Sequence, residues 1–250
     1  SALISKMGRN RVPIFVAATR QHVGKTSVSM ALMSGLRKRF KQVGFIKPVG
    51  QQHIPVTEVT GETVRVDKDV QVVREYFGID GVDYQTMSPV LVPRDYTKQY
   101  IDGKISKEAQ EQKIKSAFNT LSSTSDMVLL EGTGHSGVGS IIELSNAYVA
   151  GLVGADVVLV ANGGLGSAFD ELSLNRVLCV QNGVRVRGVI LNKVVPSKVE
   201  MVRDYFGRLL RERWGVPLLG VVPDLPFLGR PTLRDIEIAT GSTLIGGDSY

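Results

Sequence analysis

A short loop near the N-terminus carries the residue types that bind phosphate. Residues 18–27 read Ala-Thr-Arg-Gln-His-Val-Gly-Lys-Thr-Ser, between the apolar run 13–17 and a helix-like pattern. Gly24 lets the backbone approach an anion, Lys25 adds a mobile positive charge, and the Thr26 hydroxyl suits Mg²⁺. Strand, loop and helix in this order predict a nucleotide phosphate site. The expected contacts are Val23, Gly24, Lys25, Thr26 and Ser27.

The loop departs from the usual phosphate-binding pattern at its start. The glycine expected five residues before Gly24 is Thr19. Arg20 lies five residues before Lys25, where one branch of P-loop ATPases carries a second lysine that reaches the nucleotide of a dimer partner. Two interpretations of Arg20 stay open: a contact made in trans, and a solvated loop residue.

Two more charged residues are expected at the edge of the sheet that holds this loop. The strand 43–46 delivers Lys47 at its carboxyl end, where open parallel sheets place their ligands, so Lys47 either faces the phosphates or lies on the surface. The apolar strand 126–131 ends in Glu131. An acid at the tip of a buried strand beside such a loop can bind Mg²⁺ directly or through water. The glycine-rich residues 132–140 predict a loop.

Polar residues further along the chain can reach a nucleobase. Asn192, Lys193 and Pro223 leave later strands at the same edge, far from the phosphate loop. The Asn192 amide offers a donor and an acceptor to an adenine edge, although a strand-end asparagine that caps a turn is equally common. Both roles of Asn192 therefore remain open at this stage.

Composition excludes several classes of protein. The chain has 250 residues, of which 43% are hydrophobic and 22% charged, as in an ordinary globular domain. No apolar run approaches the roughly 18 to 20 residues of a membrane span, and no secretory signal precedes the first strand, so we expect a soluble protein of the cytoplasm or an organellar matrix. The net charge of +6 is scattered, without interleaved aromatic residues, so nucleic acid is not an expected partner.

Alternating strands and helices predict the architecture. Strands are expected at 13–17, 43–46, 126–131, 156–161, 186–192 and 218–222, and helices after the phosphate loop and at 69–77, 106–121, 145–153, 168–182 and 197–213. This order predicts an α/β fold with a doubly wound, mostly parallel sheet of the P-loop NTPase type and helices on both faces. Residues 50–68 predict a loop or short hairpin. The single cysteine, Cys179, lies in a predicted helix and excludes an internal disulfide.

Four segments together resemble the dethiobiotin synthetase family of P-loop enzymes. They are Val23-Gly24-Lys25-Thr26, Lys47-Pro48-Val49, Val128-Leu129-Leu130-Glu131-Gly132 and Leu191-Asn192-Lys193. The resemblance implies a homodimer in which ATP phosphorylates a carbamate made from CO₂ and an amine. It implies Lys25 and Lys47 on the phosphates, with Thr26, Glu131 and Asp69 on Mg²⁺. Asp67 is the alternative to Asp69. Asn192, Lys193 and the segment after Pro223 are implied to bind the adenine end of the nucleotide.

The substrate side differs from the synthetases proper. Arg20 replaces an acid, Ser88-Pro89-Val90 replaces Ser-Pro-His, and Thr133-Gly134-His135 replaces a glycine pair. The glycine-rich stretches are closer to the synthetase-like domain at the N-terminus of long phosphotransacetylases and to related stand-alone ATPases. In those proteins the domain is regulatory or of unknown activity. We therefore expect a piece of a longer protein, with a flexible segment 1–12, a P-loop ATPase domain 13–228, and a tail or start of a small domain at 229–250.

The predicted function is an ATP- and Mg²⁺-binding domain that acts as a slow ATPase or as a regulatory nucleotide-binding module of a larger protein. One alternative is a ligase that phosphorylates a carbamate or carboxylate, of the dethiobiotin synthetase or cobyrinate amidation type, with Lys25, Lys47 and Glu131 as catalytic residues. A substrate would then bind at the dimer interface. Glutamine-dependent amidation by this chain alone is not expected, because Cys179 is unsuited to a glutaminase. Another alternative is an ATP-dependent dimerisation switch of the partition ATPase type.

Overall fold

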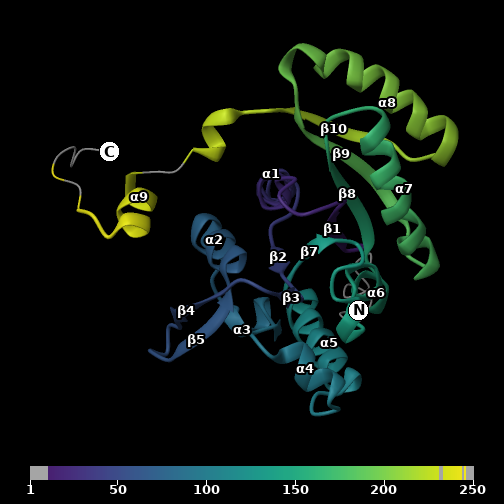
Figure 1. Cartoon of the computed structure of the whole chain (residues 1–250). Coiled ribbons are helices and arrows are strands. Elements are labelled where there is room, and N and C mark those ends of the chain that lie inside the picture. The colour runs from purple at the N-terminus through teal and green to yellow at the C-terminus, as the bar shows by residue number, and fades with distance from the viewer. Residues whose placement is uncertain (1–10, 231–232, 244, 246–250) are drawn as a thin grey trace, which may run out of the picture.

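A six-stranded parallel sheet organises the protein (Figure 1). The computed structural model describes residues 11–230, 233–243 and 245. The spatial order of the strands is β10-β9-β8-β1-β7-β2, and each neighbouring pair is parallel. Their bounds are β1 Ile14–Ala18, β2 Val43–Ile46, β7 Met127–His135, β8 Asp156–Asn162, β9 Val186–Val194 and β10 Leu218–Pro223. Since β1 lies between β7 and β8, the loop that follows it lies at the centre of the sheet's carboxyl edge.

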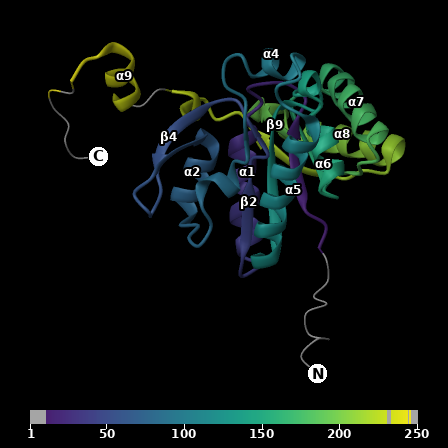
Figure 2. The same cartoon turned by 90° about the horizontal axis from the view of Figure 1, so that it is seen from below.

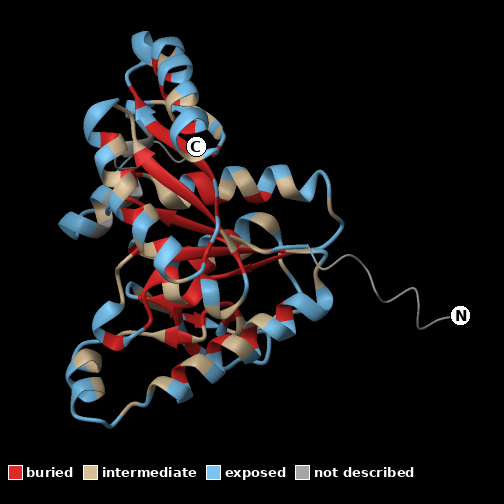
Figure 3. Ribbon diagram, turned by 90° about the vertical axis from the view of Figure 1, so that its right-hand side faces the viewer, coloured by how far each residue is buried: buried red, intermediate tan, exposed pale blue. Residues whose placement is uncertain are grey.

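Helices cover both faces of the sheet, which confirms the predicted doubly wound fold. On one face lie α1 (Lys25–Arg37), α2 (Lys68–Phe77) and α3 (Tyr84–Met87); on the other lie α5 (Lys107–Thr124), α6 (Asn146–Leu152), α7 (Gly166–Gln181) and α8 (Val199–Trp214). Phe15 packs into the core beneath the second group and Val16 into the core beneath the first. Because both sets of side chains are buried, the strands are continuous apolar runs. Figure 3 shows this buried centre in red.

Shorter elements connect the sheet to its surroundings. β4 (His53–Thr57) and β5 (Thr63–Asp67) form an antiparallel hairpin, as predicted for residues 50–68. The remaining elements are β3 (Val49–Gly50), β6 (Val90–Leu91), α4 (Tyr96–Ile101), η2 (Ser140–Ile142), η3 (Pro196–Lys198), η4 (Pro226–Gly229) and α9 (Leu233–Thr240). Figures 1 and 2 show α9 well away from the sheet. None of the helices in the described ranges combines the length and the apolar character that a membrane span requires.

The structure corrects two boundaries near the predicted site. Residues 132–135 are not a loop: β7 continues through them to His135, and Glu131 therefore lies inside the strand rather than at its tip. Asn146 holds this glycine-rich stretch extended by donating to the carbonyls of Thr133 and His135, each at 2.7 Å. Helix α2 begins at Lys68, with Asp67 as its N-cap. Most of the predicted flexible segment 1–12 lies outside the described residues, and the domain boundaries remain a prediction.

Candidate functional site

The turn from β1 into α1 presents an uncapped helix N-terminus. Gly24 is the N-cap residue, with φ 83° and ψ 34°, and no side chain caps the helix. The backbone N–H groups of Lys25, Thr26 and Ser27 have no hydrogen-bond partner among the described residues. Val23, 1% exposed, anchors the turn in the core. Unpaired N–H groups at the positive end of a helix dipole favour an anion.

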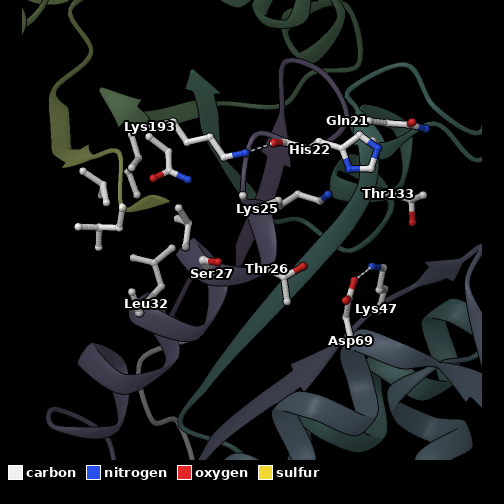
Figure 4. Close-up of a pocket in the computed structure, with 18 of the residues that line it drawn as sticks. Gln21, His22, Lys25, Thr26, Ser27, Leu32, Lys47, Asp69, Thr133 and Lys193 are labelled. Atoms are coloured by element: carbon white, nitrogen blue, oxygen red, sulfur yellow. Dashed lines mark hydrogen bonds and ion pairs between the residues drawn. The ribbon is translucent and has the colours of Figure 1, made fainter. Parts of the chain in front are cut away.

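Two lysines lie beside this helix end. Lys47, directly after β2, is 5% exposed, and Lys25 is half-buried in the first turn of α1. Figure 4 shows both side chains extending into one cavity together with Thr26. Burial lowers the pKa of Lys25, and the neighbouring Glu131 carboxylate only partly offsets this effect. A bound anion near Lys25 would stabilise its charged form.

Lys47 lies among three carboxylates. Its Nζ donates to Asp69 Oδ2, is 3.3 Å from Asp67 Oδ1 and is 3.7 Å from Glu131 Oε1. Burial alone would lower the pKa of Lys47, but the three carboxylates outweigh burial and raise it. Lys47 is therefore a cation within a cluster of acids. The sequence alone left open whether Lys47 faces the phosphates or lies on the surface, and the structure shows it buried.

The two aspartates at the start of α2 have different bonding. Asp67 accepts from the backbone N–H of Asp69 at 3.0 Å through Oδ1, and from that of Gln52 at 3.4 Å through Oδ2. The Asp69 carboxylate contacts only Lys47 among the described residues. Since Asp67 is occupied as a helix cap, Asp69 has the greater capacity to accept a further ligand.

Glu131 is fully buried and only partly satisfied. Its Oε1 accepts from the Thr26 hydroxyl at 2.9 Å, while Oε2 has no hydrogen-bond partner. Burial raises the pKa of Glu131, and the charges of Lys47 and Lys25 oppose that rise. No group of three His, Cys, Asp or Glu side chains within the described ranges is arranged to hold a metal ion by itself. A metal ion at this site would also need ligands from the nucleotide or from water. Mg²⁺ ordinarily has such ligands in proteins.

A cavity of about 910 Å³ joins this charged end to an apolar end. The apolar end is lined by Ala31, Leu32, Ile190, Val222, Pro223 and Leu225. Asn192 and Lys193 also line the cavity and bind the phosphate loop. Asn192 Nδ2 donates to the Val23 carbonyl at 2.8 Å. Lys193 Nζ donates to the His22 carbonyl at 2.7 Å (Figure 4). The cavity thus brings together every predicted phosphate, metal and base residue except Val23, which lies beneath it, and Glu131, which is buried behind Thr26.

Arg20 lies at the rim of the loop and has a partner in its own chain. Its Nη1 is 3.7 Å from Glu171 Oε1, and its side chain is 56% exposed. Glu171 Oε2 also accepts from the Thr19 hydroxyl at 2.8 Å. Exposed ion pairs contribute about 0 to 1 kcal/mol, so this pair does not fix Arg20 in place.

Two asparagines that support the site were not predicted from the sequence. Asn175 of α7 accepts from the Ser136 N–H at 2.8 Å and donates to the Thr19 carbonyl at 3.3 Å, which ties the loop after β7 to the loop after β1. Asn146 of α6 holds the end of β7, as described above. Both are distant in sequence from their partners, and no local pattern distinguishes them from surface asparagines.

The chain is similar to several known proteins. A family model described as an AAA domain matches residues 13–232. The phosphate acetyltransferase of Nitratidesulfovibrio vulgaris is 24% identical, over 94% of this chain and 32% of that protein. The cobyric acid synthase of Clostridium perfringens is 28% identical, over 84% of this chain and 45% of the other. The ATP-dependent dethiobiotin synthetase BioD of Aromatoleum aromaticum is 27% identical, over 84% of this chain and 89% of the enzyme.

The chain thus spans about a third to a half of the length of the first two relatives and most of the third. Among solved structures, the MinC:MinD cell division complex of Aquifex aeolicus has a TM-score of 0.51 at 15% identity, with 88% of this chain and 84% of that chain covered. Such low identity shows the fold alone. The matches confirm the predicted resemblance to dethiobiotin synthetases and to the N-terminal region of phosphotransacetylases.

Gly24 gives a test of the turn itself. A Cβ added at Gly24 would lie 2.3 Å from Asn192 Nδ2, and the residue has a positive φ. Gly24→Ala should therefore lower the free energy of unfolding by about 1 to 3 kcal/mol. Urea denaturation measures this change.

The matched control lies in the same helix. Gly35 has no atom within 4 Å of an added Cβ, so Gly35→Ala should raise stability by about 0.5 to 1 kcal/mol. Equal effects of the two substitutions would contradict the described geometry of the turn.

Proposed function

The chain belongs to the AAA domain family, whose model matches residues 13–232, and we propose that it binds ATP and Mg²⁺ as a dethiobiotin synthetase-like P-loop ATPase domain. The observation that carries the proposal is the uncapped N-terminus of α1, which follows a left-handed Gly24 and lies beside Lys25 and Lys47. These features provide donors and positive charge for a polyphosphate. The ATP-dependent synthetase among the relatives supports ATP as the nucleotide.

At the phosphate end, the two lysines have separate tasks. Lys25 extends from the first helical turn and neutralises phosphate charge, while the N–H groups of the turn position the oxygens. Lys47 approaches from the other side and can exchange its carboxylate partners for a phosphate oxygen. The apolar end of the cavity, with Leu32, Ile190 and Pro223, suits the faces of a purine ring.

The residues present also fit Mg²⁺. The Glu131 Oε2 atom is buried without a partner, Thr26 provides a hydroxyl, and Asp69 has a greater capacity than Asp67 to accept a further ligand. Thr26, Glu131 and Asp69 would therefore hold the ion, directly or through water. When bound, Mg²⁺ neutralises charge on the transferred phosphoryl group.

We assign the domain to slow ATP hydrolysis or to regulatory nucleotide binding within a larger protein. Support comes from the phosphate acetyltransferase relative, of which the chain matches only 32%. The alternative is a ligase that phosphorylates a carbamate or carboxylate, supported by the dethiobiotin synthetase match over 89% of that enzyme. ATP turnover measured with and without candidate amines and carboxylates distinguishes the two, because only the ligase requires an acceptor.

Replacement of Lys25 tests the phosphate site. Lys25→Ala removes one charge-assisted contact, so the ATP affinity should fall about thirtyfold or more, the equivalent of roughly 2 kcal/mol. The fold should survive, because the Lys25 side chain makes no hydrogen bond or ion pair with the described residues. Isothermal titration calorimetry measures the affinity.

The control is Lys38→Ala, which removes an exposed lysine from the opposite end of α1. It should leave ATP affinity unchanged. Undiminished ATP binding by folded Lys25→Ala protein would rule out the proposed phosphate site.

A second pair of variants tests the metal ligands. Asp69→Asn keeps the shape of the side chain but removes a charge, so the gain in ATP affinity on adding Mg²⁺ should shrink by about tenfold or more. Glu131→Gln should show the same metal dependence. Asp67→Asn should leave most of the Mg²⁺ effect, because an asparagine can also cap α2 and Asp67 is the helix cap rather than the proposed metal ligand. A Mg²⁺ effect lost with Asp67→Asn but kept with Asp69→Asn would reverse the assignment.

An ATP-dependent dimerisation switch is the second candidate function. Arg20 is exposed at the rim of the phosphate loop and is weakly held by Glu171 of α7. The same helix exposes Leu174 and Val177, which are 75% and 63% exposed. A second copy of this chain packed on that helix would cover these apolar side chains and bring Arg20 near the partner's nucleotide.

Mixed subunits test this contact. Arg20→Ala subunits mixed with Lys25→Ala subunits should recover ATP hydrolysis at one site per mixed dimer, since the intact Lys25 and the partner's intact Arg20 then meet at that site. Subunits with different tags confirm the exchange. If mixing adds no activity to the sum of the separate variants, Arg20 does not act in trans.

A further inference from the structure

The end of β9 is attached to the phosphate loop by two consecutive side chains. Asn192 is 7% exposed, pairs with Asn162 of β8, and accepts from the Gly163 N–H at 2.7 Å through its own carbonyl. Its Nδ2 donates to the Val23 carbonyl at 2.8 Å. The amide packs so closely that a Cβ on Gly24 would lie 2.3 Å from Nδ2. The Asn192 side chain is thus set against the loop backbone by a rigid strand.

Lys193 makes the adjacent contact. Its Nζ donates to the His22 carbonyl at 2.7 Å, although the residue is exposed and has no acidic partner among the described residues. Both Lys193 and His22 have positive φ values, 55° and 61°. Such a backbone costs about 1 to 2 kcal/mol for a residue other than glycine, so two of them joined by one hydrogen bond indicate a constrained junction.

These two bonds orient the loop amides through the planarity of the peptide bond. In a trans peptide the C=O and the following N–H point in opposite directions. With the carbonyls of His22 and Val23 held toward the end of β9, the N–H groups of Val23 and Gly24 are turned the other way. Neither N–H donates a hydrogen bond within the described part of the chain. Gly24 lines the cavity, so its N–H is available to a phosphate.

From these contacts we infer that Asn192 and Lys193 are positioning residues for the phosphate loop, and that they determine affinity for the polyphosphate. The inference rests on the proposed nucleotide site and changes the expected role of both residues. Asn192 and Lys193 act on phosphate indirectly, through the carbonyls of Val23 and His22.

Tripolyphosphate, which has no base, separates the two roles. Asn192→Asp replaces the donor with an acceptor facing the Val23 carbonyl, and Lys193→Met removes the ammonium but keeps the stem. Each variant should weaken the binding of ATP and of tripolyphosphate by the same factor, about tenfold. The backbone amide resonances of Val23 and Gly24 should also shift in the ligand-free variants. Lys193→Arg should retain part of the affinity.

The matched control is Lys68→Met, which removes a positive charge from the same cavity without a contact to the loop. The loss of ligand affinity caused by Lys68→Met should disappear at high salt, because salt screens long-range interactions between charges. The loss caused by Lys193→Met should persist. If Asn192→Asp fails to fold, the ATP and tripolyphosphate affinities of Lys193→Met test the inference.

Loss of ATP affinity with intact tripolyphosphate affinity would show that these residues read the base and would overturn the inference. Unchanged affinities, with only a lower melting temperature, would overturn it too, because the residues would then be structural. Failure of the unmodified protein to bind either ligand would instead contradict the proposed function.

Discussion

The left-handed turn at Gly24 is the constraint on which the site depends. With φ at 83°, Gly24 reverses the chain between β1 and α1 and leaves the first N–H groups of the helix without internal partners. A side chain at this position would overlap the Asn192 amide. The same glycine therefore permits the turn, exposes the donors and allows β9 to hold the loop. Strands β2, β7 and β9 bring Lys47, Glu131 and Asn192 to this point, because the parallel strands end at one edge.

Charge balance is the second feature of the site. Lys25 and Lys47 face Asp67, Asp69 and Glu131, so the cluster has a formal charge of −1 when all five groups are ionised. Neither cations nor anions dominate, which suits a site proposed to take a polyphosphate and Mg²⁺ together. A phosphate bound alone would be repelled by the carboxylates, and a metal ion bound alone would be repelled by the Lys47 ammonium. Binding of each would therefore favour the other, since each neutralises the charge that opposes its partner.

The features that could be predicted from the sequence depend on residues close together in the chain. The apolar runs predicted β1, β2 and β8 to within a few residues, because strands covered on both faces are apolar throughout. The apolar run of β10 was also predicted, although this edge strand is partly exposed. The loop residues 23–27 were found because their spacing is local. The extension of β7 through its glycines was missed, since Asn146, a residue of another element, holds it. The contacts of Lys47, Asn192 and Asn175 also join segments distant in sequence, and no local pattern specifies them.

A crystal structure with Mg²⁺ and a non-hydrolysable ATP analogue tests the central claim most directly. The account predicts phosphates against the N–H groups of residues 23–27, the ion beside Thr26, and the base between Leu32 and Pro223. It also predicts that the Lys47 ammonium leaves the carboxylates of Asp67 and Asp69 for a phosphate oxygen. Nucleotide bound elsewhere, or phosphates remote from Gly24 with Lys47 still among the acids, would contradict it.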